Sequence, residues 1–233
     1  MTQNIDPATT RRALIKSAFV IASGAAVTAC VSRTTHVASA PPLAVPSAAP
    51  IPSAPAVAAK KLPTGIRPEL VKRAVAALDR HSMRVPSHDR IAIADFAAPS
   101  YRPRFHLVHL GSGTVESFLV AHGIGSDPEH TGLLHRFSNE VNSEATCEGA
   151  FLTDEYYVGK HGHSQRLRGL DPTNNNAYDR AIVVHSSWYA NSDMIAKHGK
   201  LGRSQGCFAV GEQELAKVFE RLGPGRMIYS AKV

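Results

Sequence analysis

The residue in this sequence best suited to covalent chemistry is Cys207, which ends the run Ser204-Gln205-Gly206-Cys207. A glycine directly before a cysteine lets the backbone approach a bound ligand closely. Backbone amides in such a turn can converge on one oxygen and stabilise the oxyanion of a tetrahedral intermediate. An isolated free cysteine is more often a small buried hydrophobic residue. The turn therefore permits a nucleophilic thiol without establishing one.

A thiol with a pKa of ~8.5 is mostly protonated at neutral pH, so it needs a base or a positive neighbour before it can attack. His185 is the natural base, because it ends a strand that we expect at residues 181–185. A nearby backbone carbonyl would orient its second ring nitrogen, and Ser186 and Ser187 lie within reach. The spacing of His185 and Cys207 does not by itself show that they meet.

A longer pattern surrounds these two residues. His185-Ser186 and Ser204-Gln205-Gly206-Cys207 resemble the two halves of the signature of YkuD-type L,D-transpeptidase catalytic domains, which is His-Gly or His-Ser, a spacer, and Ser/Thr-His-Gly-Cys. The murein L,D-transpeptidase catalytic domain family, a bacterial branch, is similar over residues from about 90 to 230. The segments that carry this similarity are Phe137-Ser138-Asn139, Tyr157 to Gly162 with Gly159-Lys160-His161-Gly162, Arg180-Ala181-Ile182-Val183, and Gly199–Cys207.

The resemblance implies that Cys207 attacks the L-linked centre of the diamino acid in a peptidoglycan tetrapeptide stem and expels the terminal D-alanine. His185, oriented beside Ser186, would take the thiol proton, and the amides of Gly206 and Cys207 would hold the oxyanion. Cationic side chains in the substrate groove would suit a carboxylate-rich substrate. The residues expected to line this groove are Ser204, Arg203, Gln205, Lys160 and His161. The reaction needs no cofactor and no metal, because its energy is held in the cleaved peptide bond.

Three features depart from the family pattern. Gln205 stands where the signature has its second histidine, and Ala209 stands where an arginine is common. The spacer between His185 and Cys207 is also a few residues longer. These differences concern substrate contacts and leave the nucleophile and the base matched. Transfer to an amine, hydrolysis by an L,D-carboxypeptidase with the same nucleophile, and murein binding without catalysis all remain open.

The elements expected around these residues are mostly strands. Leu70, Val71, Ala74, Val75 and Leu78 recur at helical spacing and predict a helix over 68–83, and a second helix is expected over 212–222. Short apolar runs between turn residues predict strands at 91–96, 105–110, 115–120, 149–158, 164–170, 181–185 and 226–231. Residues 64–233 therefore predict one mainly β domain with flanking helices, a β-sandwich or barrel-like fold.

The composition of the first sixty residues predicts an export signal followed by an unstructured tether. Arg11-Arg12 ahead of a short apolar stretch resembles a twin-arginine export signal over residues 1–29, with an ordinary secretory signal as the alternative. Val27-Thr28-Ala29-Cys30 resembles a lipobox, which implies that Cys30 carries lipid; an incidental cysteine is the plainer alternative. Residues 30–63 are rich in Ala, Pro and Ser and predict an unstructured tether. We therefore expect an exported lipoprotein at the periplasmic face of a membrane.

Composition limits the other partners and sites. The formal net charge is +7, and residues 1–29 carry two of these charges, which leaves +5 on the remainder. The basic residues are scattered without a run or interleaved aromatics, so no nucleic-acid partner is expected. The pairs His106/His109 and His161/His163 lack the cysteine or glutamate companions of a zinc site. Cys147 is expected to be an inert thiol, with an oxidised pair between Cys147 and Cys207 as a second hypothesis.

Overall fold

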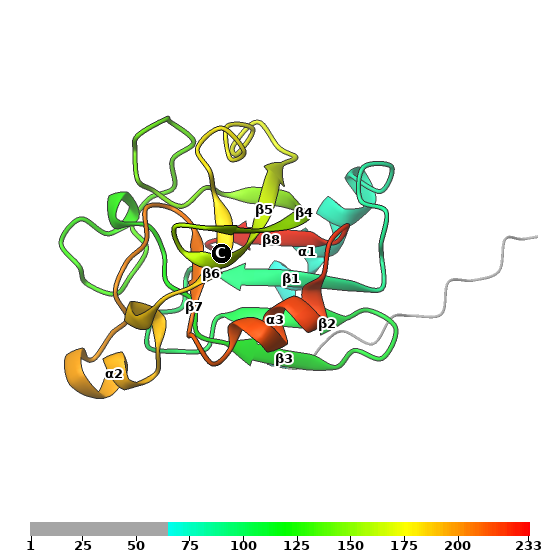
Figure 1. The fold of residues 1–233 in the computed structure, drawn as a ribbon. Coiled ribbons are helices and arrows are strands. Elements are labelled where there is room, and N and C mark those ends of the chain that lie inside the picture. Colours follow the sequence, from blue (N-terminus) through cyan, green and yellow to red (C-terminus); the bar gives the residue numbers. More distant parts are fainter. Residues whose placement is uncertain (1–64) are drawn as a thin grey trace, which may run out of the picture. The chain divides into compact units, whose positions relative to one another are not determined.

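The computed structural model describes residues 65–233, and the predicted signal, Cys30 and the tether lie outside them. Eight strands of this part form one sheet in the order β3-β2-β1-β8-β4-β5-β6-β7 (Figure 1). Their bounds are β1 Arg90–Asp95, β2 Phe105–His109, β3 Val115–Phe118, β4 Gly149–Gly159, β5 Gly162–Gly169, β6 Val183–Ser186, β7 Phe208–Val210 and β8 Met227–Ala231. Three α-helices accompany the sheet: α1 Pro68–Arg80, α2 Asp193–His198 and α3 Leu215–Leu222.

The central strands are covered on both faces. Side chains alternate along a strand, so Ala92 and Ala94 of β1 enter one core cluster while Ile91 and Ile93 enter the other. The amphipathic helix α1 packs on the second cluster, and α3 supplies apolar side chains to the first. Because both faces of β1 are buried, the sheet centre is a rigid support for the strands beside it.

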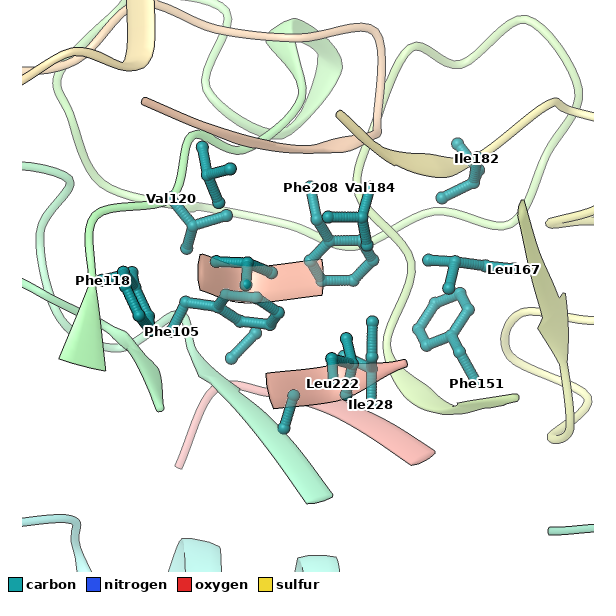
Figure 2. Close-up of a cluster of buried hydrophobic side chains, with 14 of the residues drawn as sticks. Phe105, Phe118, Val120, Phe151, Leu167, Ile182, Val184, Phe208, Leu222 and Ile228 are labelled. Atoms are coloured by element: carbon teal, nitrogen blue, oxygen red, sulfur yellow. The ribbon is translucent and has the colours of Figure 1, made fainter. Parts of the chain in front are cut away.

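The two ends of the sheet approach each other. The chain that continues from β3 forms a bridge from Ala121 to Ala209 of β7, in which Ala121 N–H donates to the Ala209 carbonyl at 2.8 Å. Phe105 of β2 and Phe208 of β7, near opposite ends of the sheet order, stack on each other, and Phe151 of the central strand β4 packs against Phe208 in the same cluster (Figure 2). The prediction of a mainly β, barrel-like fold with flanking helices is confirmed.

All the expected elements are present, with shifted ends. The helix expected over 68–83 ends at Arg80, and the helix expected over 212–222 begins at Leu215. Every predicted strand exists. The sequence did not predict β7 or α2, because β7 has only three residues and α2 only six, too few for a periodic pattern.

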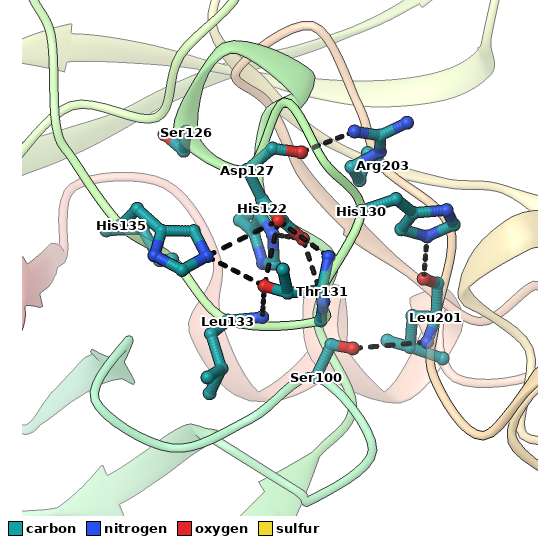
Figure 3. A network of polar contacts seen from close by, with 12 residues as sticks. Ser100, His122, Ser126, Asp127, His130, Thr131, Leu133, His135, Leu201 and Arg203 are labelled. Carbon is teal, nitrogen blue, oxygen red and sulfur yellow. Dashed lines mark hydrogen bonds and ion pairs between the residues drawn. The ribbon is translucent and has the colours of Figure 1, made fainter.

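A chain of buried polar groups links β2 to the segment after β3. Arg104, which is fully buried, donates to the carbonyls of Val120 and Ala98 and to His122 Nδ1 at 2.6 Å. The other ring nitrogen of His122 lies 3.2 Å from Asp127 Oδ2. Asp127 also accepts hydrogen bonds from Thr131 and from the Gly132 amide, as Figure 3 shows for part of this network. Each buried charge therefore has partners.

These contacts determine the charge states. Burial, followed by the charge of Arg104, lowers the pKa of His122 to about 3 against the raising effect of Asp127. Burial opposes ionisation of Asp127, but hydrogen bonds from Thr131, Gly132 and His122 outweigh it and lower its pKa to about 2. The network at neutral pH is thus a guanidinium, a neutral imidazole and a carboxylate in series.

Among residues 65–233 no helix combines the length and apolar composition needed to cross a bilayer.

The first prediction concerns acid sensitivity. His122 has a folded pKa of about 3, below its unfolded value of ~6.5, so between these values the unfolded state binds more protons. Stability should therefore fall as the pH drops below 6.5, and His122 should contribute about 1–2 kcal/mol of loss between pH 7 and pH 5. His122→Gln can still accept from Arg104 and donate to Asp127 but does not titrate. Urea unfolding at both pH values should show a smaller pH-dependent loss in this variant; equal losses would contradict the assignment.

Candidate active site

The parallel pairing of β6 and β7 brings Cys207 and His185 to the same face of the sheet. Val184 pairs with Phe208, both lie in the core, and His185 pairs with Ala209. Alternation along each strand turns the residue before Phe208 and the residue after Val184 away from the core. Cys207 and His185 therefore face the same side from neighbouring strands.

Both side chains open into one cavity of about 400 Å³. This cavity also contains every residue that the sequence predicted for the substrate groove. Its lining residues are Tyr157, Lys160, His161, Ala181, Val183, His185, Tyr189, Arg203, Ser204, Gln205 and Cys207. A larger cavity of about 470 Å³ lies near α2 and is lined by neither cysteine nor histidine. The cavity of about 400 Å³ is the candidate active site because it alone of the two is lined by a thiol and an imidazole.

The loop before Cys207 is braced from two directions. Ser204 Oγ donates to the Cys207 carbonyl at 2.7 Å and accepts from Gly206 N–H at 3.1 Å, which closes the turn on itself. The Ser204 amide donates to the His122 carbonyl at 2.9 Å, so the turn is attached to the buried network. Arg203 donates to the carbonyl of Asp127 (Figure 3) and to that of Pro128. The cysteine is therefore presented by a turn that two segments hold in place.

Gly206 is required at this turn by conformation and by space. Its φ is +110°, which L residues rarely adopt. A Cβ at this position would lie 2.7 Å from the Ala145 carbonyl oxygen and 2.8 Å from Ile182 Cδ1. The backbone of Gly123 packs just as closely, since a Cβ there would lie 2.9 Å from Gly206 Cα. The turn is thus pressed against the 123 and 145 segments.

The imidazole of His185 is oriented by the chain itself. Its Nδ1 lies 2.8 Å from the carbonyl oxygen of Ser186. Because a carbonyl can only accept, Nδ1 carries the hydrogen and donates it to this bond, and Nε2 keeps its lone pair. Burial is the main cause that lowers the pKa of His185 to about 4, with the charges of His161 and Lys160 acting the same way and the Ser186 carbonyl opposing them. At neutral pH this ring is an uncharged base.

The thiol of Cys207 is protonated in the same state. Burial raises the pKa of Cys207, and the Val183 amide and the charges of Lys160 and Arg180 counteract part of that effect. Its Sγ donates to the carbonyl of Ala181 at 3.6 Å, and residues 65–233 contain no hydrogen bond between it and His185. The structure therefore shows a neutral thiol and a neutral imidazole lining one cavity.

Four cavity residues were not assigned to the site from the sequence, namely Ala181, Val183, Tyr157 and Tyr189. Ala181 has a φ of +53°, and its carbonyl accepts from Cys207. A non-glycine residue with positive φ is a recognised mark of a functional site, but no sequence signal reveals it at an alanine. Tyr157 and Tyr189 form aromatic walls, and burial raises the pKa of Tyr189 to about 12. Tyr157 begins the segment 157–162, which resembles the family, so this resemblance could have identified Tyr157 as a site residue.

Cys147 is buried in the core, and neither it nor Cys207 forms a disulfide. Its Sγ donates to the Ser138 carbonyl at 3.3 Å and accepts from Arg180 at 2.8 Å. Arg180 also donates to the Ala145 carbonyl at 2.6 Å, behind Gly206. The arginine thus holds the 138–147 loop against the nucleophile turn, and the oxidised cysteine pair stays a prediction.

Two other residues considered from the sequence, His106 of a histidine pair and Gln205 of the groove, make hydrogen bonds to neighbouring side chains. His106 Nδ1 bonds Ser117 Oγ at 2.8 Å between β2 and β3, away from the cavity. Gln205 donates to Glu144 at 2.7 Å. Within the described part of the chain, no three His, Cys, Asp or Glu side chains are grouped closely enough to hold a metal ion.

The chain belongs to the L,D-transpeptidase catalytic domain family, whose model YkuD_2 matches residues 63–230. No curated protein matches the sequence.

Several solved structures share part of the fold at low identity. An L,D-transpeptidase from Mycobacterium smegmatis is 14% identical, with a TM-score of 0.39, over 61% of this chain and 58% of that one. An L,D-transpeptidase from Mycobacterium tuberculosis is 12% identical, with a TM-score of 0.39, over 62% and 58% of the two chains. A helical cell shape determining protein from Campylobacter jejuni is 9% identical, with a TM-score of 0.41, over 61% and 47%. The chain thus spans less than two-thirds of the length of each of these three structures.

The second prediction tests the nucleophile turn. Gly206→Ala should lower the free energy of unfolding by more than about 2 kcal/mol, because strained φ and backbone clashes combine. Gly199→Ala is the matched control, since Gly199 also has positive φ, +71°, but has no atom within 4 Å of an added Cβ, so only about 1–2 kcal/mol is expected. Urea unfolding measures both variants. Equal losses would show that the close packing around Gly206 has no energetic role.

Proposed function

We propose that this chain is a cysteine L,D-transpeptidase that acts on peptidoglycan tetrapeptide stems through an acyl-enzyme on Cys207. The observation that carries the proposal is the shared cavity of Cys207 and His185, with the imidazole tautomer set by the Ser186 carbonyl. Membership of the L,D-transpeptidase catalytic domain family supports the reaction class. A thiol, a base oriented by a third group and a cavity beside them are the parts that acyl transfer requires.

The charge states define how the first step proceeds. Because the pKa of Cys207 is raised and that of His185 is lowered, a preformed thiolate–imidazolium pair is disfavoured at neutral pH. The thiol therefore turns from the Ala181 carbonyl towards His185 Nε2 and loses its proton as Sγ attacks the substrate carbonyl. The protonated imidazole then gives that proton to the leaving amine of D-alanine, and the C–S bond of the acyl-enzyme replaces the peptide bond.

The oxyanion is held by backbone donors at the turn. The amide of Cys207 has no hydrogen-bond partner among residues 65–233, so it is free to donate to the oxyanion. Gly206 N–H donates to Ser204 Oγ at 3.1 Å and joins the Cys207 amide only when that contact opens. Ser204 thus controls the second donor.

The cavity walls suit a stem peptide. Lys160 and Arg203 supply positive charge for substrate carboxylates, and Tyr157 and Tyr189 supply apolar surface. An amine of a second stem that reaches the acyl-enzyme gives cross-linking or exchange. Water that reaches it gives L,D-carboxypeptidase activity with the same nucleophile.

The third prediction tests the nucleophile and the base. Cys207→Ala and His185→Gln should each lower the rate of D-alanine release from a disaccharide tetrapeptide by at least about 10³-fold. Cys147→Ala is the matched control, since this core thiol does not line the cavity and should leave the rate within about 3-fold. Mass spectrometry follows free D-alanine, tripeptide and cross-linked dimer.

The products distinguish the candidate functions. Dimer together with D-alanine supports transfer, whereas tripeptide without dimer supports the carboxypeptidase. If the unmodified protein is as inert as Cys207→Ala and no carbapenem adduct forms on Cys207, the enzymatic proposal fails. Murein binding without catalysis is then the leading function.

The amino-terminal pattern supports a location at the periplasmic face of a membrane, with Cys30 lipid-modified. The support is the order of Arg11-Arg12, an apolar stretch and Val27-Thr28-Ala29-Cys30. Two acyl chains on Cys30 would anchor the domain stably, whereas one would be marginal.

The fourth prediction tests this anchor. When the full chain is expressed in a bacterium, it should fractionate with membranes, and Cys30→Ala should move it to the soluble fraction. Cys147→Ala serves as the control that changes a cysteine outside the lipobox. Mass spectrometry should find a diacylglyceryl group on the amino-terminal peptide that begins at Cys30. An unmodified peptide and an unchanged distribution would remove the lipoprotein assignment.

A further inference from the structure

The tip of the β4–β5 hairpin reaches the active site and contributes a second imidazole. The hairpin pairs Gly159 with Gly162, which leaves Lys160 and His161 as its two-residue tip. Both tip residues line the cavity that contains Cys207 and His185. β5 also pairs directly with β6, with Ser164 opposite His185, so the tip is fixed relative to the strand that carries the base.

The two imidazoles are stacked. The ring centroids of His161 and His185 lie 4.3 Å apart, with 23° between the ring planes. His185 is 1% exposed, whereas His161 lies at the surface of the described domain. The outer ring therefore covers one face of the inner ring and separates it from solvent.

The surroundings of His185 oppose a positive charge on it. The titratable groups that line its cavity are Tyr157, Lys160 and His161 from the β4–β5 hairpin, Tyr189 from the segment after β6, and Arg203 and Cys207 from the nucleophile loop. Arg180 acts on Cys207 from behind the turn. Residues 65–233 place no carboxylate in this cavity lining. Only the Ser186 carbonyl, on Nδ1, favours the imidazolium.

We propose that His161 is a positioning residue for the proposed acyl transfer: its ring, stacked on His185, fixes the plane of the base and keeps it dehydrated and uncharged. The hydrogen bond from Nδ1 to Ser186 restrains one edge of the His185 ring but leaves rotation about that contact free. A parallel ring at 4.3 Å removes that freedom. The lone pair of Nε2 is thereby held in the direction of the cavity where the thiol has to deliver its proton.

His161 lacks the contacts that would give its side chain a purely structural role. Its side chain makes no hydrogen bond to any other residue that the structure describes, and it belongs to none of the three core clusters. Its main contact is the ring of the base. Truncation at this position should therefore leave the unfolding midpoint of the protein almost unchanged, since surface substitutions have small effects on stability.

The same hairpin offers a matched control. His163 is two residues further on, is also exposed, and stacks on Tyr156 at 6.4 Å instead of on His185. His163 does not line the cavity. Replacement of His163 removes an imidazole of equal size and charge from the hairpin without uncovering the base.

The experiment compares the full-length protein with His161→Ala, His161→Phe and His163→Ala. Histidine ring 15N spectra recorded from pH 3.5 to pH 8, with the His185 signals assigned by their loss in His185→Gln, report its pKa and tautomer. In His161→Ala the pKa of His185 should rise from about 4 by about one unit or more towards ~6.5, because water reaches the ring. His161→Phe should keep most of the wild-type tautomer and pKa because it restores the stack, and His163→Ala should not change them.

The second readout is the rate at which a carbapenem acylates Cys207, followed by intact mass. His161→Ala should slow this rate by about 5-fold or more at pH 8, where His185 is uncharged in both proteins, because the ring plane of the base is no longer fixed. The loss should grow at pH 5, where the raised pKa of His185 in the variant adds protonation of the base. An unchanged pKa and tautomer of His185 in His161→Ala would overturn the inference. Because the ring spectra need no substrate, a shifted pKa in a protein that forms no acyl-enzyme would contradict only the proposed function.

Discussion

The constraint on which the site depends is the parallel pairing of β6 with β7. Its register places Val184 opposite Phe208 in the core, and this fixes the outward direction of His185 and of the cysteine just before Phe208. A shift of one residue in either strand would turn the thiol or the imidazole into the apolar interior. Burial of Phe208, which packs against three other phenylalanine rings, is therefore what holds the two reactive groups on one face.

The three-residue strand β7 needs support from outside the sheet, and the buried network supplies it. Arg104, directly before the first residue of β2, donates to the Val120 carbonyl, and the next residue, Ala121, bridges to β7. The carbonyl of His122 accepts a hydrogen bond from the Ser204 amide. One segment, residues 120–122, therefore holds both β7 and the turn that carries Cys207. A fully buried arginine is costly to desolvate, and its four hydrogen-bond contacts to carbonyls and an imidazole offset that cost.

The electrostatics of the site follow from burial rather than from charge pairing. The thiol and the imidazole both stay neutral because each is largely removed from water, and among residues 65–233 no carboxylate lines the cavity to stabilise an imidazolium. Such a pair resists adventitious alkylation and oxidation, since the reactive thiolate forms only as the proton leaves. For the proposed reaction the imidazole of His185 has to be correctly oriented in advance. The Ser186 carbonyl and the stacked ring of His161 are the two groups that can orient it.

The sequence by itself determined the mainly β class and the helix from Pro68, and it predicted Cys207 and His185 as the candidate nucleophile and base, because hydrophobic period and a short signature are local properties. It predicted Ser186 as a neighbour of the base and Lys160 and His161 as groove residues only through resemblance. Tertiary structure decided that His185 and Cys207 line one cavity, that Ala181 adopts positive φ beside the thiol, and that His122 braces the turn. These features arise from strand order and from contacts between segments far apart in the chain, for which no local pattern exists.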